Sequence, residues 1–122
     1  MKILIIEPGQ HPRRADIPHS LENLQQVVGG CIQAIYPFPD PVAVICDEEG
    51  LLKGYELNRA VAERDIICGT FFICGLGEDD FTDLPDELAD KYEKQFYHPE
   101  AFARTPKGIL VISADGIREV IL

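Results

Sequence analysis

Two long apolar runs set the strongest constraint on how this chain folds. The segment Val42–Asp47 reads Val-Ala-Val-Ile-Cys before its aspartate, without the polar alternation of a half-exposed strand. The segment Asp65–Leu76 is the most apolar part of the chain, and its β-branched residues and Phe71-Phe72 pair favour a long, buried strand. Because a strand without alternation is covered on both faces, the sequence predicts a sheet with Val42–Asp47 at its centre.

Two segments have the apolar spacing of helices. Residues 21–28 follow Ser20, which is placed to cap them, and a glycine pair stops this helix. Apolar residues recur every four positions from Leu84 to Phe96, and Asp83 is the expected cap of this second helix. The sequence predicts two principal helices.

Short β-prone runs surround these helices. Residues Lys2–Glu7 and Arg13–Ile17 predict an opening hairpin, and Ile109–Ser113 and Ile117–Leu122 predict a closing one. Cys31–Tyr36 reads as a strand that a proline-rich loop joins to the central strand.

The least regular part of the chain lies between the two apolar runs. Leu51–Leu57 predicts one short strand, and Asn58–Arg64 predicts a turn or a helical stretch. Taken together, the elements predict an α+β fold: a mixed, mostly antiparallel sheet of about six to eight strands with two principal helices, opening and closing with hairpins.

Length and charge limit the classes of function. The chain has 122 residues, in the usual range for a single domain, 1–122. Its net charge of −10 disfavours direct nucleic-acid binding, because phosphate backbones are negative as well. Only four apolar residues, Ile3 to Ile6, follow the first lysine, whereas a secretory core needs roughly 7–15. We therefore expect a cytoplasmic protein without membrane contact.

Residue types that carry chemistry are present without a recognisable motif. The sequence Gly75-Leu76-Gly77 lacks the third glycine of a dinucleotide-binding turn, and acidic residues follow where phosphates would lie. The histidines have no partner at zinc-ligand spacing, and the cysteines lie among apolar neighbours as reduced core thiols. We therefore predict no metal site, no cofactor and no catalytic residue among the histidines and cysteines. These residues are His11, His19, His98, Cys31, Cys46, Cys68 and Cys74.

Several phrases of the sequence resemble one family. They are Ser20–Ala34 (SLENLQQVVGGCIQA), Asp47–Gly50, Gly54–Arg59, Gly69–Phe72 and Asp80–Thr82. Their combined order is similar to domain-of-unknown-function family 3846, small proteins of Gram-positive bacteria, their phages and their conjugative elements, sometimes beside antirestriction-type domains. The resemblance covers residues 1 to about 96 and implies no assigned activity. Residues 97–122 depart from it and form an expected C-terminal hairpin extension.

Acidic residues concentrate before and within the second predicted helix. Eight of the 21 acidic residues lie within 16 positions, with Lys91 the only base among them. They form either a solvated helix face or an acidic surface that competes with nucleic acid for a basic protein. The candidates for such contacts are Glu78, Asp79, Asp80, Asp83, Asp86 and Asp90.

Asn58 and Arg59 are the remaining polar candidates. They belong to the family-like pattern and are either a polar anchor at a surface site or a buried side-chain cap on nearby carbonyls. We favour the structural role.

Three functional hypotheses follow. The first is a non-enzymatic protein-interaction module of a mobile element, which binds an unidentified protein through its acidic helix or the loop with Asn58 and Arg59. The alternative is a small cytosolic enzyme that uses an unrecognised cysteine or carboxylate in a pocket. The third is a homodimer formed through an edge strand.

Overall fold

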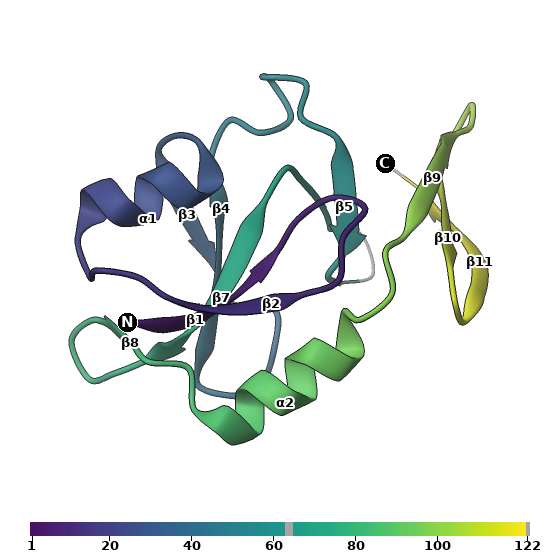
Figure 1. The fold of residues 1–122 in the computed structure, drawn as a ribbon. Helices are drawn as coiled ribbons and strands as arrows, with labels where there is room; N and C mark the ends of the chain where they lie inside the picture. Colours follow the sequence, from purple (N-terminus) through teal and green to yellow (C-terminus); the bar gives the residue numbers. More distant parts are fainter. Residues whose placement is uncertain (63–64, 122) are drawn as a thin grey trace.

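The computed structural model describes residues 1–62 and 65–121, with two helices and eleven strands among them (Figure 1). This confirms the α+β class and the two helices, although the strands are more numerous than expected. In chain order the elements are β1 (Lys2–Ile6), β2 (Arg13–Asp16), α1 (Leu21–Val28), β3 (Ile32–Ile35), β4 (Val42–Asp47), β5 (Leu57–Ala60), β6 (Ile66–Cys68), β7 (Phe71–Leu76), β8 (Phe81–Thr82), α2 (Asp86–Gln95), β9 (Ala101–Arg104), β10 (Gly108–Ser113) and β11 (Gly116–Ile121).

The strands form three antiparallel sheets. The largest has the order β2-β1-β7-β4-β3, with β8 paired to β7, while β5 and β6 pair together and β9, β10 and β11 form the third sheet. The opening hairpin β1-β2 and the closing hairpin β10-β11 are both confirmed. The predicted centre was wrong by one strand, because β7 lies between β1 and β4.

The largest sheet separates two apolar layers, as its strands without alternation require. Alternate residues of β1 point to opposite faces: Leu4 and Ile6 pack with α2, and Ile3 and Ile5 pack with α1. Every residue of β4 is buried. Figure 1 shows one helix on each side of this sheet. The prediction that the central strands are covered on both faces is therefore confirmed.

Two sequence predictions in the middle of the chain were wrong. The expected long strand Asp65–Leu76 is divided at Gly69, whose φ of +81° lies in a region that β-strands do not use. The expected strand Leu51–Leu57 is mostly turn, and a strand, β5, occupies the start of the expected turn or helix at Asn58–Arg64. Residues 63 and 64 of that stretch lie outside the described residues.

The two helices begin in different ways. Ser20 caps α1 as predicted, because its hydroxyl oxygen accepts a hydrogen bond from the Asn23 amide. Asp83 does not cap α2: its carboxylate accepts from the Lys2 amide at 2.8 Å, and Pro85 precedes the helix instead. Within the described residues, no helix is long and apolar enough to cross a membrane.

The third sheet follows α2 and lies to one side of the molecule (Figure 1). Its first strand, β9, was not predicted from the sequence. Pro106 and Gly108 mark the turn that follows, but the strand has only four residues and Phe102 is its one large apolar side chain. Ile109, Val111 and Val120 are buried on one face of this sheet. The expected C-terminal hairpin is therefore part of a three-stranded sheet.

Candidate functional site

The acidic residues of the sequence gather around the β7–β8 loop and α2. We call this set the acid-rich surface: Glu78, Asp79, Asp80, Asp83, Asp86, Glu87, Asp90 and Glu93. All of them are exposed except Glu93, which is half-buried. The six acidic candidates from the sequence thus all lie on the outside of the molecule.

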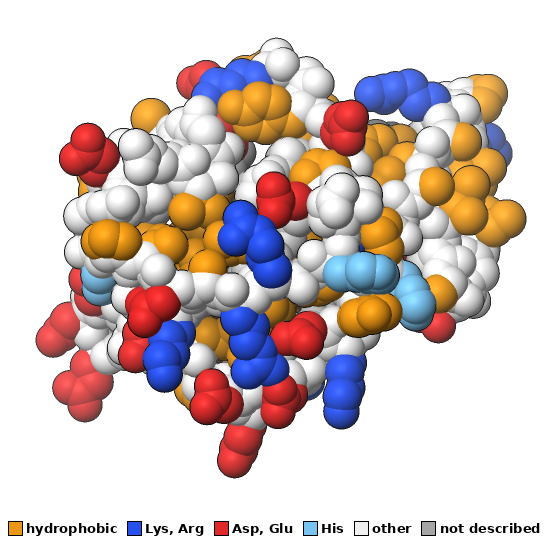
Figure 2. Space-filling model, viewed as in Figure 1, with side chains coloured by type: hydrophobic (Ala, Val, Ile, Leu, Met, Phe, Trp, Pro, Cys, Tyr) orange, Lys and Arg blue, Asp and Glu red, His pale blue; other side chains and the backbone are white. Residues whose placement is uncertain are grey.

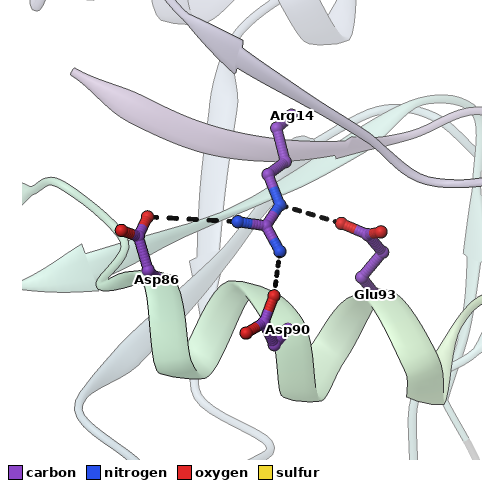
Figure 3. Close-up of polar contacts among 4 residues, drawn as sticks. All are labelled: Arg14, Asp86, Asp90 and Glu93. Atoms are coloured by element: carbon purple, nitrogen blue, oxygen red, sulfur yellow. Dashed lines mark hydrogen bonds and ion pairs between the residues drawn. The ribbon is translucent and has the colours of Figure 1, made fainter.

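Arg14 is the main counter-charge of this surface, a role that no local sequence pattern indicates. Strand alternation sends Arg13 to Glu7, at 2.9 Å, and sends Arg14 to the opposite side, toward α2. Figure 3 shows the Arg14 guanidinium among three helix carboxylates, with Nε donating to Glu93 Oε2 at 2.9 Å and Nη2 donating to Asp90. Asp86 Oδ1 lies 3.9 Å from Nη1.

The negative charge of the three carboxylates on α2 is therefore only partly neutralised by Arg14. Asp86, Asp90 and Glu93 recur at helical spacing and share a single guanidinium, so the group of four side chains keeps a net negative charge. The hydrogen bonds that Arg14 donates to Glu93 and Asp90 raise the pKa of its guanidinium, which keeps the positive charge in place. The arrangement orders the carboxylates without cancelling their charge.

Other acidic candidates hold local structure. Asp80 accepts from its neighbouring Phe81 amide at 2.7 Å and lies 3.4 Å from His19 Nε2. Asp83 holds the start of β1, as described above. Within the described residues no ion pair or side-chain hydrogen bond involves the carboxylates of Glu78, Asp79 and Glu87. These three carboxylates remain available to a partner.

The surface in Figure 2 shows the same distribution. Acidic side chains gather at the lower edge, over α2, and basic side chains interrupt them. Hydrophobic side chains gather instead at the right, over the third sheet. In this view the surface over the third sheet is thus richer in apolar side chains than the surface over α2.

Asn58 and Arg59 lie inside the fold, with 0% and 1% of their area exposed. The Asn58 amide nitrogen donates to the carbonyls of Ile6 and Gly69, at 2.9 and 2.8 Å. Their burial corrects the hypothesis that these two side chains form a contact surface. The favoured interpretation, a buried cap on nearby carbonyls, agrees with the contacts.

Arg59 connects three segments of the chain. Its guanidinium donates to the carbonyls of Gln10 and Phe96, at 2.6 and 3.1 Å, and to Asn58 Oδ1 at 2.9 Å. The Phe96 carbonyl ends α2, so the positive charge lies at the negative end of the helix dipole. Burial lowers the pKa of Arg59, and the nearby Glu100 carboxylate opposes that effect. This pair of residues holds the acid-bearing helix in position.

One of the hollows in the surface, of about 240 Å³, brings buried thiols and a carboxylate together. Cys46, Asp47 and Cys68 are among its lining residues. Burial raises the pKa of both thiols, so they stay protonated and are poor nucleophiles at neutral pH. Burial raises the pKa of Cys74 to about 12. Cys31 is exposed, which corrects its assignment to the core.

Asp47 is buried at the edge of this hollow, and both of its carboxylate oxygens accept hydrogen bonds. Burial by itself raises the pKa of the carboxyl group, but hydrogen bonds from Lys53, the Glu49 amide and Tyr55 bring it below the ordinary value. Lys53 Nζ lies 2.8 Å from Asp47 Oδ2 and also donates to the Gly29 carbonyl after α1, at 3.3 Å. The carboxylate thus ties a turn to the end of a helix.

Acid should weaken this tie. The folded pKa of Asp47 lies below the unfolded one, so its contribution to stability is present above about pH 4 and is lost as the pH falls through the folded value. We expect Lys53→Met to flatten the decline of the urea midpoint below about pH 4, because the cause of the low pKa is gone. The matched control is Lys94→Met at the end of α2; equal slopes for the two variants would contradict the assignment.

The chain is an α+β protein. Its helix α2 carries more exposed carboxylates than Arg14 neutralises, and the buried side chains of Asn58 and Arg59 hold this helix in place. The chain belongs to the family described as Domain of unknown function (DUF3846), whose model matches residues 1–97. The match ends directly after α2, so β9, β10 and β11 lie outside it. No curated protein and no solved structure matches the chain.

Proposed function

We propose that the protein is a non-enzymatic binding module that contacts a basic protein through its acid-rich surface. The observation that carries this proposal is the shortage of counter-charge there. One guanidinium, that of Arg14, serves three helix carboxylates, and further exposed carboxylates flank them. A negative field held on a well-packed helix attracts basic partners and accelerates their association.

The charge of the whole chain narrows the class of partner. A net charge of −10 repels phosphate backbones and attracts surfaces rich in lysine and arginine. Proteins that bind nucleic acid carry such surfaces, so a nucleic-acid-handling protein is the partner that fits best. The acid-rich surface then competes with nucleic acid for it. We also propose that the protein is encoded by a phage or a conjugative element, as the family resemblance implies.

The second candidate is a small cytosolic enzyme, because the hollow contains two thiols and a carboxylate. The raised pKa of both thiols and the occupied Asp47 carboxylate favour the binding module over it. We expect iodoacetamide to modify only the exposed Cys31 in the native protein, and all four cysteines in denaturant, as mass spectrometry would show. Rapid native modification of Cys46 or Cys68 would instead support an enzyme site.

The test of the binding module uses carboxylates that make no ion pair or side-chain hydrogen bond within the described residues. We expect the variant Glu78→Gln, Asp79→Asn, Glu87→Gln to lose most of the basic proteins that the wild type captures from a host lysate at low salt. Their carboxylates make no ion pair within the described residues, so the fold should be unchanged. Circular dichroism and the thermal midpoint check the fold.

The matched control removes the same number of charges from exposed positions elsewhere: Glu22→Gln, Glu48→Gln, Glu56→Gln. We expect this variant to keep its captured proteins, apart from a small uniform loss due to net charge. If both triple variants capture the same proteins, the acid-rich surface is a solvated coat and the proposal fails.

A further inference from the structure

The third sheet has two very different faces. Register and strand alternation place Ile109, Val111 and Val120 on the buried face. The opposite face, which we call the outer face, is formed by Ala101, Ala103, Leu110, Ile112, Ile117, Glu119 and Ile121. An antiparallel sheet with one solvated face normally carries polar residues there.

The outer face is apolar although it is open to solvent. Ile112, Ile117 and Ile121 are 39%, 69% and 57% exposed, and Glu119 is the one charged residue of this face within the described strands. The exposed edge strand β2 offers a contrast within the same molecule, because its sequence is Arg-Arg-Ala-Asp. An exposed apolar patch of this kind marks a contact surface.

The size of the outer face limits what covers it. Three strands about 4.8 Å apart and six residues of about 3.3 Å each give a face of roughly 14 by 20 Å. Two copies that meet through this face alone would bury roughly 600 Å² in total, about half of what a stable interface needs. One α-helix is about 10 Å wide, and about 13 residues of it span 20 Å. Helix on sheet is also the usual way in which such a face is covered.

The charge distribution of the chain further limits the class of partner that can cover the outer face. Residues 98–122 contain three acidic and three basic residues, so the net charge of −10 resides in residues 1–97. That charge repels anionic membranes, which disfavours a lipid surface as the occupant. On the outer face Glu119 lies beside Leu110, its partner in the β10-β11 register. Because β11 is an edge strand, this carboxylate lies at the border of an apolar face and selects a partner with one basic side chain beside its apolar ones.

We propose that the outer face of the third sheet binds an amphipathic helix of another protein, with a lysine or arginine of that helix facing Glu119. The apolar stripe of the helix covers Ile112 and Ile117, and its polar side stays in solvent. This surface lies outside residues 1–97 and is separate from the acid-rich surface, so it stands or falls independently of the proposed function.

The test selects helices from a library. A displayed library of helix-forming peptides of about 14 residues is selected on the wild type, and peptides that also bind the variant Ile112→Lys, Ile117→Lys are removed. We expect the enriched sequences to show apolar residues at i, i+3, i+4 and i+7 with one lysine or arginine beside them. No enrichment, or sequences without this period, would overturn the proposal.

Titration of an enriched peptide then tests the contacts. We expect Ile117→Lys to weaken binding about tenfold or more, and Glu119→Lys to weaken it less, with recovery when the basic residue of the peptide is changed to glutamate. Glu22→Lys on α1 is the control and should leave binding unchanged. Equal affinity for all variants overturns the proposal. So does a wild-type dimer, or binding to anionic vesicles, that Ile117→Lys abolishes, because the occupant is then a second copy or a membrane.

Discussion

We expect the replacement of Arg59 by methionine to lower the free energy of unfolding by about 3–5 kcal/mol, because several buried acceptors lose a charged donor at about 1–3 kcal/mol each. The guanidinium donates to the Gln10 and Phe96 carbonyls and to Asn58 Oδ1, and water has little access to a side chain that is 1% exposed. Methionine fills similar space, so the loss comes from acceptors left without donors. Urea denaturation measures it.

Two matched variants show whether the loss of stability comes from the buried position of Arg59 or from the removal of any arginine. Arg59→Lys keeps a charge but not the planar fork, and we expect it to recover only part of the loss. Arg13→Met removes an exposed arginine that pairs with Glu7, and we expect a change below about 1 kcal/mol. If Arg59→Met is as mild as Arg13→Met, Arg59 does not tie the N-terminal loop to the end of α2.

Replacing Asn58 by leucine should cost about 3 kcal/mol, because it removes two buried donors and one acceptor at nearly constant volume. The Ile6 and Gly69 carbonyls lose the Asn58 amide, and Arg59 loses one of its acceptors. Asn23→Leu on α1 provides the comparison: within the described residues the Asn23 side chain donates to the hydroxyl of the exposed Ser20, and a change of about a few tenths of a kcal/mol is expected there.

The two buried residues should not act independently. Because Asn58 and Arg59 share a hydrogen bond and hold the same junction, we expect the double variant Asn58→Leu, Arg59→Met to lose less than the two single losses added together. Strict additivity of the three urea measurements would show that the two side chains support separate parts of the fold.

Periodicity was sufficient to predict most regular elements of the fold. The β-prone runs of β1 and β2 predicted a hairpin, and the helical spacing of α1 and α2 and the unbroken apolar runs of β4 and β7 each report local burial. The long strand Asp65–Leu76 failed because composition does not show the positive φ that divides it at Gly69. Gly75 also has a task that only three dimensions reveal: a Cβ there would lie 2.3 Å from the Asp83 carbonyl oxygen.

Only part of the candidate site could be predicted from the sequence. Clustering predicted the exposed acidic residues, because eight carboxylates in one short segment cannot all be buried. The position of Arg14 depends on β2 lying beside α2, more than 70 residues away along the chain, so no local pattern reveals it. The same holds for Arg59, whose acceptors come from the N-terminal loop and the end of α2.

Another long-range contact explains how α2 is held without a side-chain cap. Asp40, in the proline-rich loop before β4, accepts hydrogen bonds from Lys91 and from the buried Tyr92, both at 2.6 Å. Phe38 of the same loop packs on the Tyr92 ring, with centroids 4.8 Å apart. The proline-rich loop predicted before β4 thus braces the middle of the acid-bearing helix, and the Arg59 guanidinium holds the end of that helix.

The most direct test of the acid-rich surface is the salt dependence of its affinity for a captured basic protein. The dissociation constant is measured over a series of salt concentrations for the wild type, for Glu78→Gln, Asp79→Asn, Glu87→Gln, and for Glu22→Gln, Glu48→Gln, Glu56→Gln. We expect the first triple variant to bind more weakly with a shallower salt slope, and the second to follow the wild type closely. Equal slopes and equal affinities in all three proteins would contradict a functional acid-rich surface.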